Sequence, residues 1–334
     1  MFAYALRRLL ILPFILLGVS AVLFFLSHMV SGDPAKILAG EKAPPETVEL
    51  IRRQFGLDKP LPEQYRLYVT NLLRGNMGIS LTTRRPVSED LRLYFPATLE
   101  LTFVSIVLTI LLGVPLGIVS AARRNSLVDH LSRLATLSGV SMPVFWLGLL
   151  LQLIFYRYLD ILPIAGRLSL SATPPPPITG LYTVDSLLAL DMRTFWLSLQ
   201  HLFLPAVTLA FSSLAVVSRM TRSNMLEVLS QDYIRTARSK GLGAQTTLYR
   251  HALRNAFIPT LTVIGLQTGA LLSGAFLVEA IFNWPGLGLY TVRAISRLDY
   301  PAIMGASLLI TLIFILINLL VDVLYSVLDP RIRY

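Results

Sequence analysis

The sequence contains no cysteine and few charged residues. Of its 334 residues, 14% are charged and 54% are hydrophobic, whereas a soluble domain carries about 25% charged residues. This composition excludes a soluble enzyme and a disordered protein, because neither could cover or solvate so much apolar surface. The absence of cysteine excludes disulfides, thiol catalysis and cysteine-ligated metals, and it carries no information about the cellular compartment.

The sequence also lacks the motifs of nucleotide binding, hydrolysis and metal coordination. The dipeptide Gly-Lys, which a phosphate-binding P-loop requires, is absent, and so is a Gly-x-Ser-x-Gly elbow. The four histidines form no His-x-x-x-His pair, and the acidic residues form no dense cluster. We therefore predict no catalytic residue, no metal site and no cofactor on this chain.

Six runs of 20 to 26 residues are almost free of charge. As helices, they are long enough to cross the ~30 Å apolar core of a bilayer. We expect Pro96 and Pro205 to lie at the starts of two of these helices, where proline is tolerated. The sequence thus predicts an all-α integral membrane protein with six transmembrane helices: Leu9–Val30, Ala97–Ala122, Leu134–Tyr156, Ser198–Ser218, Asn255–Val278 and Ala302–Val321.

The basic residues indicate how these helices are oriented. With the N-terminus inside, the inner segments hold most of the excess of arginine and lysine, including seven basic and two acidic residues between Arg219 and Arg254. The positive-inside rule therefore places both termini in the cytoplasm. The net charge of +10 would favour nucleic acid as a partner of a soluble protein. Here membrane topology accounts for the charge, so no nucleic acid partner is predicted.

The longest segment on the predicted outer side covers residues 31–96. The apolar spacing in Pro45–Phe55 and Pro62–Leu73 predicts two short amphipathic helices within it. Mixed charges are typical of a small packed cap at the membrane surface, and contact with an outer partner is the alternative.

The inner segment 219–254 has the most informative pattern. Apolar side chains recur with helical spacing from Met225 to Ala237, and Gly241 is placed to end that helix. A second short helix is predicted from Thr246 to His251. A helix–glycine–helix projection of this kind fits a groove on a soluble partner, and a basic helix resting on anionic lipid is the alternative.

The ionisable residues near the crossings bear on the energy source. We expect Glu100 in the first turn of the second helix, Glu279 just beyond the outer end of the fifth, and Asp322 just beyond the inner end of the sixth. None is expected at mid-depth, where proton- or sodium-driven carriers place such groups. A transporter with neither these charges nor a nucleotide site depends on another subunit for energy, and segment 219–254 is the expected point of coupling.

Two stretches of this segment, Asp232–Gly241 and His251–Ala256, resemble the EAA loop of ATP-binding-cassette (ABC) importer permeases. Their form is similar to that of dipeptide/oligopeptide permeases. Shorter matches in the same order extend the resemblance over nearly the whole chain: His28–Pro34, Phe55–Pro60, Gly75–Ser80, Arg219–Ser223, Glu279–Gly288, Asp299–Pro301 and Asp329–Arg333.

The resemblance implies a type I ABC importer permease fold in a prokaryotic inner (plasma) membrane. It implies three kinds of partner besides membrane lipid: a second homologous permease, two ABC ATPase subunits that bind ATP and Mg²⁺, and an extracytoplasmic solute-binding protein with its substrate. The implied organisation is an N-terminal end and first helix at 1–30, an extracytoplasmic segment at 31–96, a transmembrane domain at 97–327 with a coupling loop at 219–254, and a cytoplasmic tail at 328–334.

The resemblance also implies functional residues, because a short helix of this loop enters a cleft on the ATPase in the family. Arg235-Thr236-Ala237 stands where the general motif has Glu-Ala-Ala, so an acidic contact made by other branches is absent. The stretch from Glu279 to Gly288 resembles a re-entrant loop at the outer mouth, where Asn283 and Trp284 are placed to contact substrate or the binding protein; a structural turn formed by Pro285-Gly286 is the alternative. Seven residues are placed at or behind the ATPase contact: Thr236, Ala237, Gly241, Leu242, Leu248, His251 and Leu253.

Two other functions stay open on the sequence. Permeases for nickel, glutathione or oligosaccharides share much of this pattern, and the ligand of the binding protein would separate them from peptide permeases. A stand-alone secondary carrier or channel is the second, and transport by the purified chain without ATP would indicate it.

Overall fold

The computed structural model describes residues 2–30, 35–36, 43–54 and 56–328. In this part of the chain the fold is helical, and an isolated β-bridge between Ile79 and Pro86 is its only strand-like pairing. The all-α fold class is thereby confirmed. Residues 31–34 of the predicted outer segment and 329–334 of the predicted tail lie outside the described residues.

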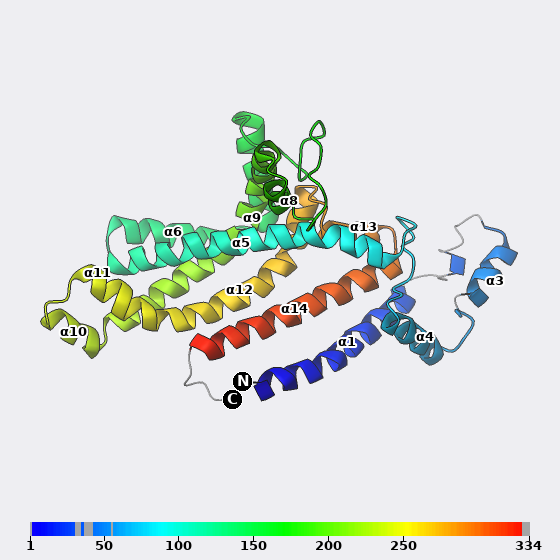
Figure 1. Cartoon of the computed structure of the whole chain (residues 1–334), viewed down its shortest axis with the longest axis horizontal. Coiled ribbons are helices and arrows are strands. Elements are labelled where there is room, and N and C mark those ends of the chain that lie inside the picture. The colour runs from blue at the N-terminus through cyan, green and yellow to red at the C-terminus, as the bar shows by residue number, and fades with distance from the viewer. Residues whose placement is uncertain (1, 31–34, 37–42, 55, 329–334) are drawn as a thin grey trace. The chain divides into compact units, whose positions relative to one another are not determined.

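The helices fall into two compact units, one consisting mainly of Pro96–Leu289 and the other of Leu6–Phe95 with Tyr290–Ile315. Figure 1 labels most of them along the chain. Their bounds are α1 Phe2–Val30, α3 Pro45–Gln54, α4 Leu61–Leu73, α5 Val87–Ala122, α6 Leu127–Ser141, α7 Val144–Leu151, the π-helix η1 Gln152–Tyr158, α8 Tyr182–Leu188, α9 Met192–Leu229, α10 Asp232–Ser239, α11 Ala244–Thr246, the π-helix η2 Thr247–Leu253, α12 Arg254–Ile281, α13 Leu287–Ser296 and α14 Tyr300–Leu328.

Several helices are long and apolar enough to cross a membrane. Four stretches of the described chain meet this condition, and a bent pair of helices makes a fifth crossing if it is counted as one span. The apolar part of α1, Leu10–Leu26, is shorter. A multi-pass membrane protein is therefore confirmed, whereas the count of six stays a prediction. The four stretches are Val87–Ala122, Met192–Leu229, Ala244–Leu272 and Tyr300–Val321.

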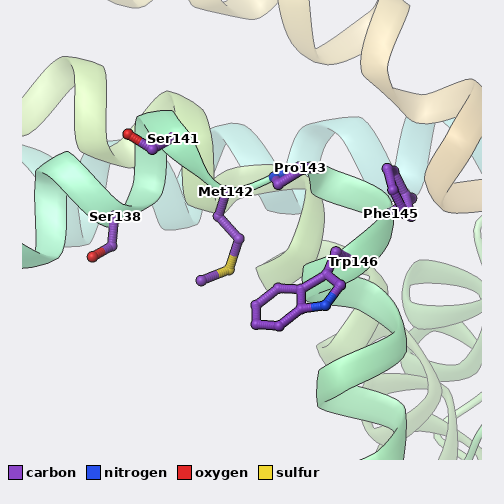
Figure 2. A pocket seen from close by; sticks show the side chains of 6 residues that line it. All are labelled: Ser138, Ser141, Met142, Pro143, Phe145 and Trp146. Carbon is purple, nitrogen blue, oxygen red and sulfur yellow. The ribbon is translucent and has the colours of Figure 1, made fainter.

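The third predicted helix, Leu134–Tyr156, is not continuous. The chain bends by 110° between Leu127–Ser141 and Val144–Tyr158. The cause is Pro143, because the residue before a proline is driven out of the helical region, and Met142 has extended angles of φ −84° and ψ 126°. An open pocket of about 480 Å³ lies at the bend. The side chains of Met142 and Trp146 extend from the same side of the bent chain (Figure 2). Its lining is Ser138, Ser141, Met142, Pro143, Phe145 and Trp146.

The expected helix starts at Pro96 and Pro205 are also wrong. Helix α5 begins at Val87 and α9 at Met192, so both prolines lie inside helices. Asp191 is the N-cap of α9, and its carboxylate accepts hydrogen bonds from the Thr194 amide at 3.0 Å and hydroxyl at 2.6 Å. Proline inside a membrane helix is tolerated where neighbouring groups take up the backbone group that it frees.

The unit around Pro96–Leu289 is organised by α9, which packs against α6, α7, α8 and α12. Its buried apolar side chains form two clusters. The first apolar cluster consists of Ala97, Leu101, Leu202, Leu204, Ala206, Leu209, Leu271, Ala275, Val278, Phe282 and Trp284. The second apolar cluster consists of Val114, Ile118, Ala121, Val217, Met225, Ile234, Ala252, Ala256 and Ile264.

In the other unit, the predicted short helices of the outer segment are confirmed as α3 and α4. Helix α4 packs on α1 through aromatic side chains: the rings of Phe24 and Tyr68 stack at 5.9 Å, and the Tyr65 hydroxyl donates to the Leu17 carbonyl at 3.0 Å. Burial, with a smaller contribution from Tyr65, raises the pKa of Tyr68 to about 12. Helix α4 is therefore anchored on α1.

Candidate functional site

The connection between α9 and α12, residues 230–253, is where the sequence placed its main site. Helices α10 and α11 lie at the end of the unit where α9 ends and α12 begins (Figure 1). The apolar stripe predicted from Met225 to Ala237 does not form one helix, because α9 ends at Leu229 and α10 begins at Asp232. The second short helix is likewise not separate, since α11 continues through η2 into α12.

Helix α10 is short and amphipathic, with one buried face and one exposed face. Ile234 is fully buried in the second apolar cluster and Ala237 is also buried, whereas Tyr233, Thr236 and Arg238 are exposed. A helix of eight residues is not stable alone in water, so the burial of Ile234 and Ala237 holds it in place. The opposite, exposed face of α10, which carries Thr236 and Arg238, is its free face.

The turn after α10 depends on glycine. Gly241 has a φ of +77°, which an L side chain rarely adopts, and its amide donates to the Arg238 carbonyl at 2.9 Å. The Leu242 amide donates to the Ala237 carbonyl at 3.3 Å, which completes a Schellman motif. The prediction that Gly241 ends this helix is confirmed. The motif directs Leu242, which is 40% exposed, outward beside the free face of α10.

The remaining predicted loop residues lie behind this face. Leu248 and Leu253 are half-buried and pack against the second apolar cluster, and His251 is also half-buried. A contact that sequence reasoning missed joins the two ends of the connection: the Asn255 side-chain amide donates to the Tyr233 hydroxyl at 2.7 Å. No sequence signal pairs these two residues, which lie 22 positions apart.

The second predicted site combines Glu279, in the last turn of α12, with Asn283 and Trp284 in the tight turn that follows this helix. Glu279 is fully buried and accepts hydrogen bonds from the Thr98 hydroxyl at 2.6 Å and the Leu289 amide at 3.0 Å. Trp284 is 1% exposed, and its indole N–H donates to the Ala97 carbonyl at 2.8 Å. Asn283 is exposed, with a φ of +44°. Two of the three side chains therefore hold this turn against α5.

The indole of Trp284 provides a test of that structural role. We expect Trp284→Phe to cost about 1 kcal/mol of stability through the lost hydrogen bond, and Trp284→Ala about 3–5 kcal/mol through lost packing. Thermal unfolding of the detergent-solubilised protein measures both values. Unchanged stability in Trp284→Ala would contradict the structural role.

The structure places Glu100 in a buried ion pair, whereas the sequence predicts it in the first turn of a helix. Because α5 begins at Val87, Glu100 does not lie in a first turn, and the helix N-terminus does not explain it. Its carboxylate instead pairs with the buried guanidinium of Arg167 at 2.5 Å and accepts from the Thr183 amide at 2.8 Å and hydroxyl at 2.7 Å. The guanidinium also lies 3.7 Å from the centre of the Tyr182 ring. These contacts fasten the stretch between η1 and α9 to α5.

Nearby, Asp185 holds the backbone of the same stretch. Its carboxylate accepts from the amides of Thr179 and Gly180 at 2.8 and 2.9 Å. Burial works against the charge on this group, but the hydrogen bonds outweigh it and lower the pKa of Asp185 below its ordinary value. Among the described residues, no group of three or more His, Cys, Asp or Glu side chains is placed to bind a metal.

Two family models together match most of the chain. One, described as binding-protein-dependent transport system inner membrane component, matches residues 113–334, and the N-terminal model of the same kind matches residues 1–102. The chain belongs to this family. Its members are membrane components of transport systems, so this permease is a transport subunit and not an enzyme. The resemblance first seen in Asp232–Gly241 is thereby confirmed.

The permease is similar over its whole length to relatives that are named as dipeptide transport permeases. It is 49% identical over 321 residues to a probable D,D-dipeptide transport system permease protein (DdpB) of Escherichia coli, covering 96% of this chain and 94% of the relative. It is 47% identical to a dipeptide transport system permease protein (DppB) of Alkalihalophilus pseudofirmus, covering all of both chains. A glutathione transport system permease protein (GsiC) of Escherichia coli is 42% identical, again over all of both chains.

Proposed function

We propose that this permease forms half of the transmembrane path of an ABC importer for dipeptides and oligopeptides. The observation that carries the proposal is its 47% identity to a dipeptide permease over the full length of both chains. The glutathione permease is less similar, at 42%. Glutathione is itself a small peptide, and it therefore serves as the sharpest competing substrate.

The permease works with a second homologous permease, two ATPase subunits that bind ATP and Mg²⁺, and an extracytoplasmic binding protein that delivers the peptide. Both termini and the α9–α12 connection face the cytoplasm. The exposed basic residues of this connection, among them Arg235, Arg238 and Lys240, support that orientation under the positive-inside rule.

The free face of α10 docks on an ATPase subunit and transmits its movement. Thr236, Gly241 and Leu242 are exposed on this side, while Ile234 is buried in the second apolar cluster with side chains of α5, α9 and α12. A displacement of α10 is therefore passed to the ends of these helices. On ATP binding, this movement closes the cytoplasmic ends and opens the outer mouth near Asn283.

Reconstitution tests this function. The two permeases and two ATPases are placed in proteoliposomes with the loaded binding protein, and uptake of a labelled dipeptide is measured with and without ATP. We expect ATP-dependent dipeptide uptake by the complete importer and none by the isolated chain. Uptake by the isolated chain without ATP, or uptake of glutathione or nickel but not of peptides, would contradict the proposal.

A further inference from the structure

A single buried carboxylate joins three helices near the α9–α12 connection. Asp129, on α6, has no exposed surface and accepts from the Ser120 hydroxyl of α5 at 2.6 Å and the Asn125 amide at 3.0 Å. It also accepts from the Arg222 guanidinium of α9, through Nε at 2.7 Å and Nη2 at 2.8 Å. Two parallel bonds of this kind fix the orientation of both side chains.

Helices α5 and α6 also approach α9 closely at two glycines. A Cβ at Gly117 of α5 would lie 2.6 Å from the Ser218 carbonyl oxygen and from Thr221 Cβ, both on α9. On α6, a Cβ at Gly139 would lie 2.6 Å from the Ala215 Cβ of α9. At these two positions, α9 lies against α5 and α6 without room for a larger side chain.

The same end of α9 leads directly to α10. Arg222 lies about two turns before the end of α9 at Leu229. Met225 of α9 and Ile234 of α10 are both fully buried in the second apolar cluster, together with Ile118 and Ala121 of α5. The ion pair thus connects α9, which leads to α10, with α6 and, through Ser120, with α5.

We propose that Asp129 and Arg222 are positioning residues for coupling, an inference that rests on the proposed function. Their bidentate pair makes the ends of α5, α6 and α9 one rigid body, so that a displacement of α10 reaches α5 and α6. A buried ion pair adds little net stability compared with apolar packing, but its fixed geometry sets the relative orientation of the helices that carry it. That orientation is what transmission of a movement requires.

The test uses the complete importer in proteoliposomes and measures two ratios. The first is dipeptide imported per ATP hydrolysed, and the second is the stimulation of ATP hydrolysis by the loaded binding protein. We expect Asp129→Asn and Arg222→Lys each to lower the first ratio by about fivefold or more, because neither can form the two parallel bonds. The double variant D129N/R222K should lose no more than D129N alone, since both changes break one interaction.

Arg133→Gln is the matched control. Arg133 is exposed, and its Nε lies 3.9 Å from a carboxylate oxygen of Asp129. Replacing it removes a positive charge near this carboxylate but leaves the bidentate pair with Arg222 intact. Both ratios should stay at the wild-type value in this variant. If D129N yields no assembled importer, R222K decides the question, because it keeps a positive charge beside Asp129.

Wild-type ratios in both D129N and R222K would overturn the inference. So would a fall in uptake and ATP hydrolysis in equal proportion, since a purely structural role lowers the amount of working importer and not the ratio. Failure of the wild-type importer to take up dipeptide with ATP would overturn the proposed function instead, which keeps the two failures apart.

Discussion

Gly241→Val lowers ATP-driven uptake by about tenfold or more, whereas Gly243→Val leaves it near the wild-type rate. At both glycines, the position that a Cβ would take has no other atom within 4 Å, so crowding does not distinguish them. Backbone conformation does: Gly241 has a φ of +77°, and Gly243 a φ of −61° that any residue adopts. A β-branched residue at position 241 costs about 1–3 kcal/mol in strain, which is relieved by opening the Schellman motif and displacing Leu242.

The two glycine variants are compared in the reconstituted importer at equal amounts of assembled protein. The membrane insertion of both should equal that of the wild type, because α10 lies outside the membrane-spanning stretches. Binding of the ATPase subunits to the permease, measured by co-purification, should weaken for Gly241→Val alone. Normal uptake with full ATP coupling in that variant would contradict the assigned role of the α10 turn.

Glu100→Gln destabilises the permease by about 3–5 kcal/mol, because it leaves the buried charge of Arg167 without its counter-ion. Arg167 is 7% exposed, and its position over the Tyr182 ring and beside the Gly180 carbonyl does not replace a carboxylate. The measurement is the thermal unfolding of the detergent-solubilised protein, together with its abundance in the membrane.

The double variant Glu100→Gln with Arg167→Met is the control for this prediction. Removing both charges abolishes the uncompensated cation, so the double variant should recover most of the stability that Glu100→Gln loses. A single variant as stable as the wild type would show that the ion pair does not hold the stretch between η1 and α9 on α5.

The features that sequence predicted correctly are local ones. The apolar runs fall on helices because a bilayer requires long uncharged stretches, and Gly241 ends α10 because few other residues adopt its backbone angles. Helix ends at the membrane surface were harder to predict. Helices α5 and α9 continue beyond the apolar runs, which places Pro96 and Pro205 inside them, and the uncharged run at Leu134–Tyr156 concealed the break at Pro143.

The features that sequence could not predict depend on distant pairing. Glu100 and Arg167 lie 67 positions apart, and Asp129 and Arg222 lie 93 positions apart, so no periodic pattern connects them. The sequence predicts a helix end for Glu100, because its pairing with Arg167 cannot be inferred from any local pattern. For the α9–α12 connection, the assignment of site residues stays a prediction, and the division into an exposed face and a buried support follows from the packing of Ile234.

Cross-linking from the free face of α10 tests the central claim most directly. Because the chain contains no cysteine, Thr236→Cys introduces a single thiol without other changes. In the assembled importer during ATP turnover, a short thiol-reactive cross-linker should join position 236 to an ATPase subunit, and a membrane-impermeant thiol reagent applied from outside the cell should not label it. Labelling from outside, or cross-links to lipid headgroups alone, would contradict a permease driven through α10 by a separate ATPase.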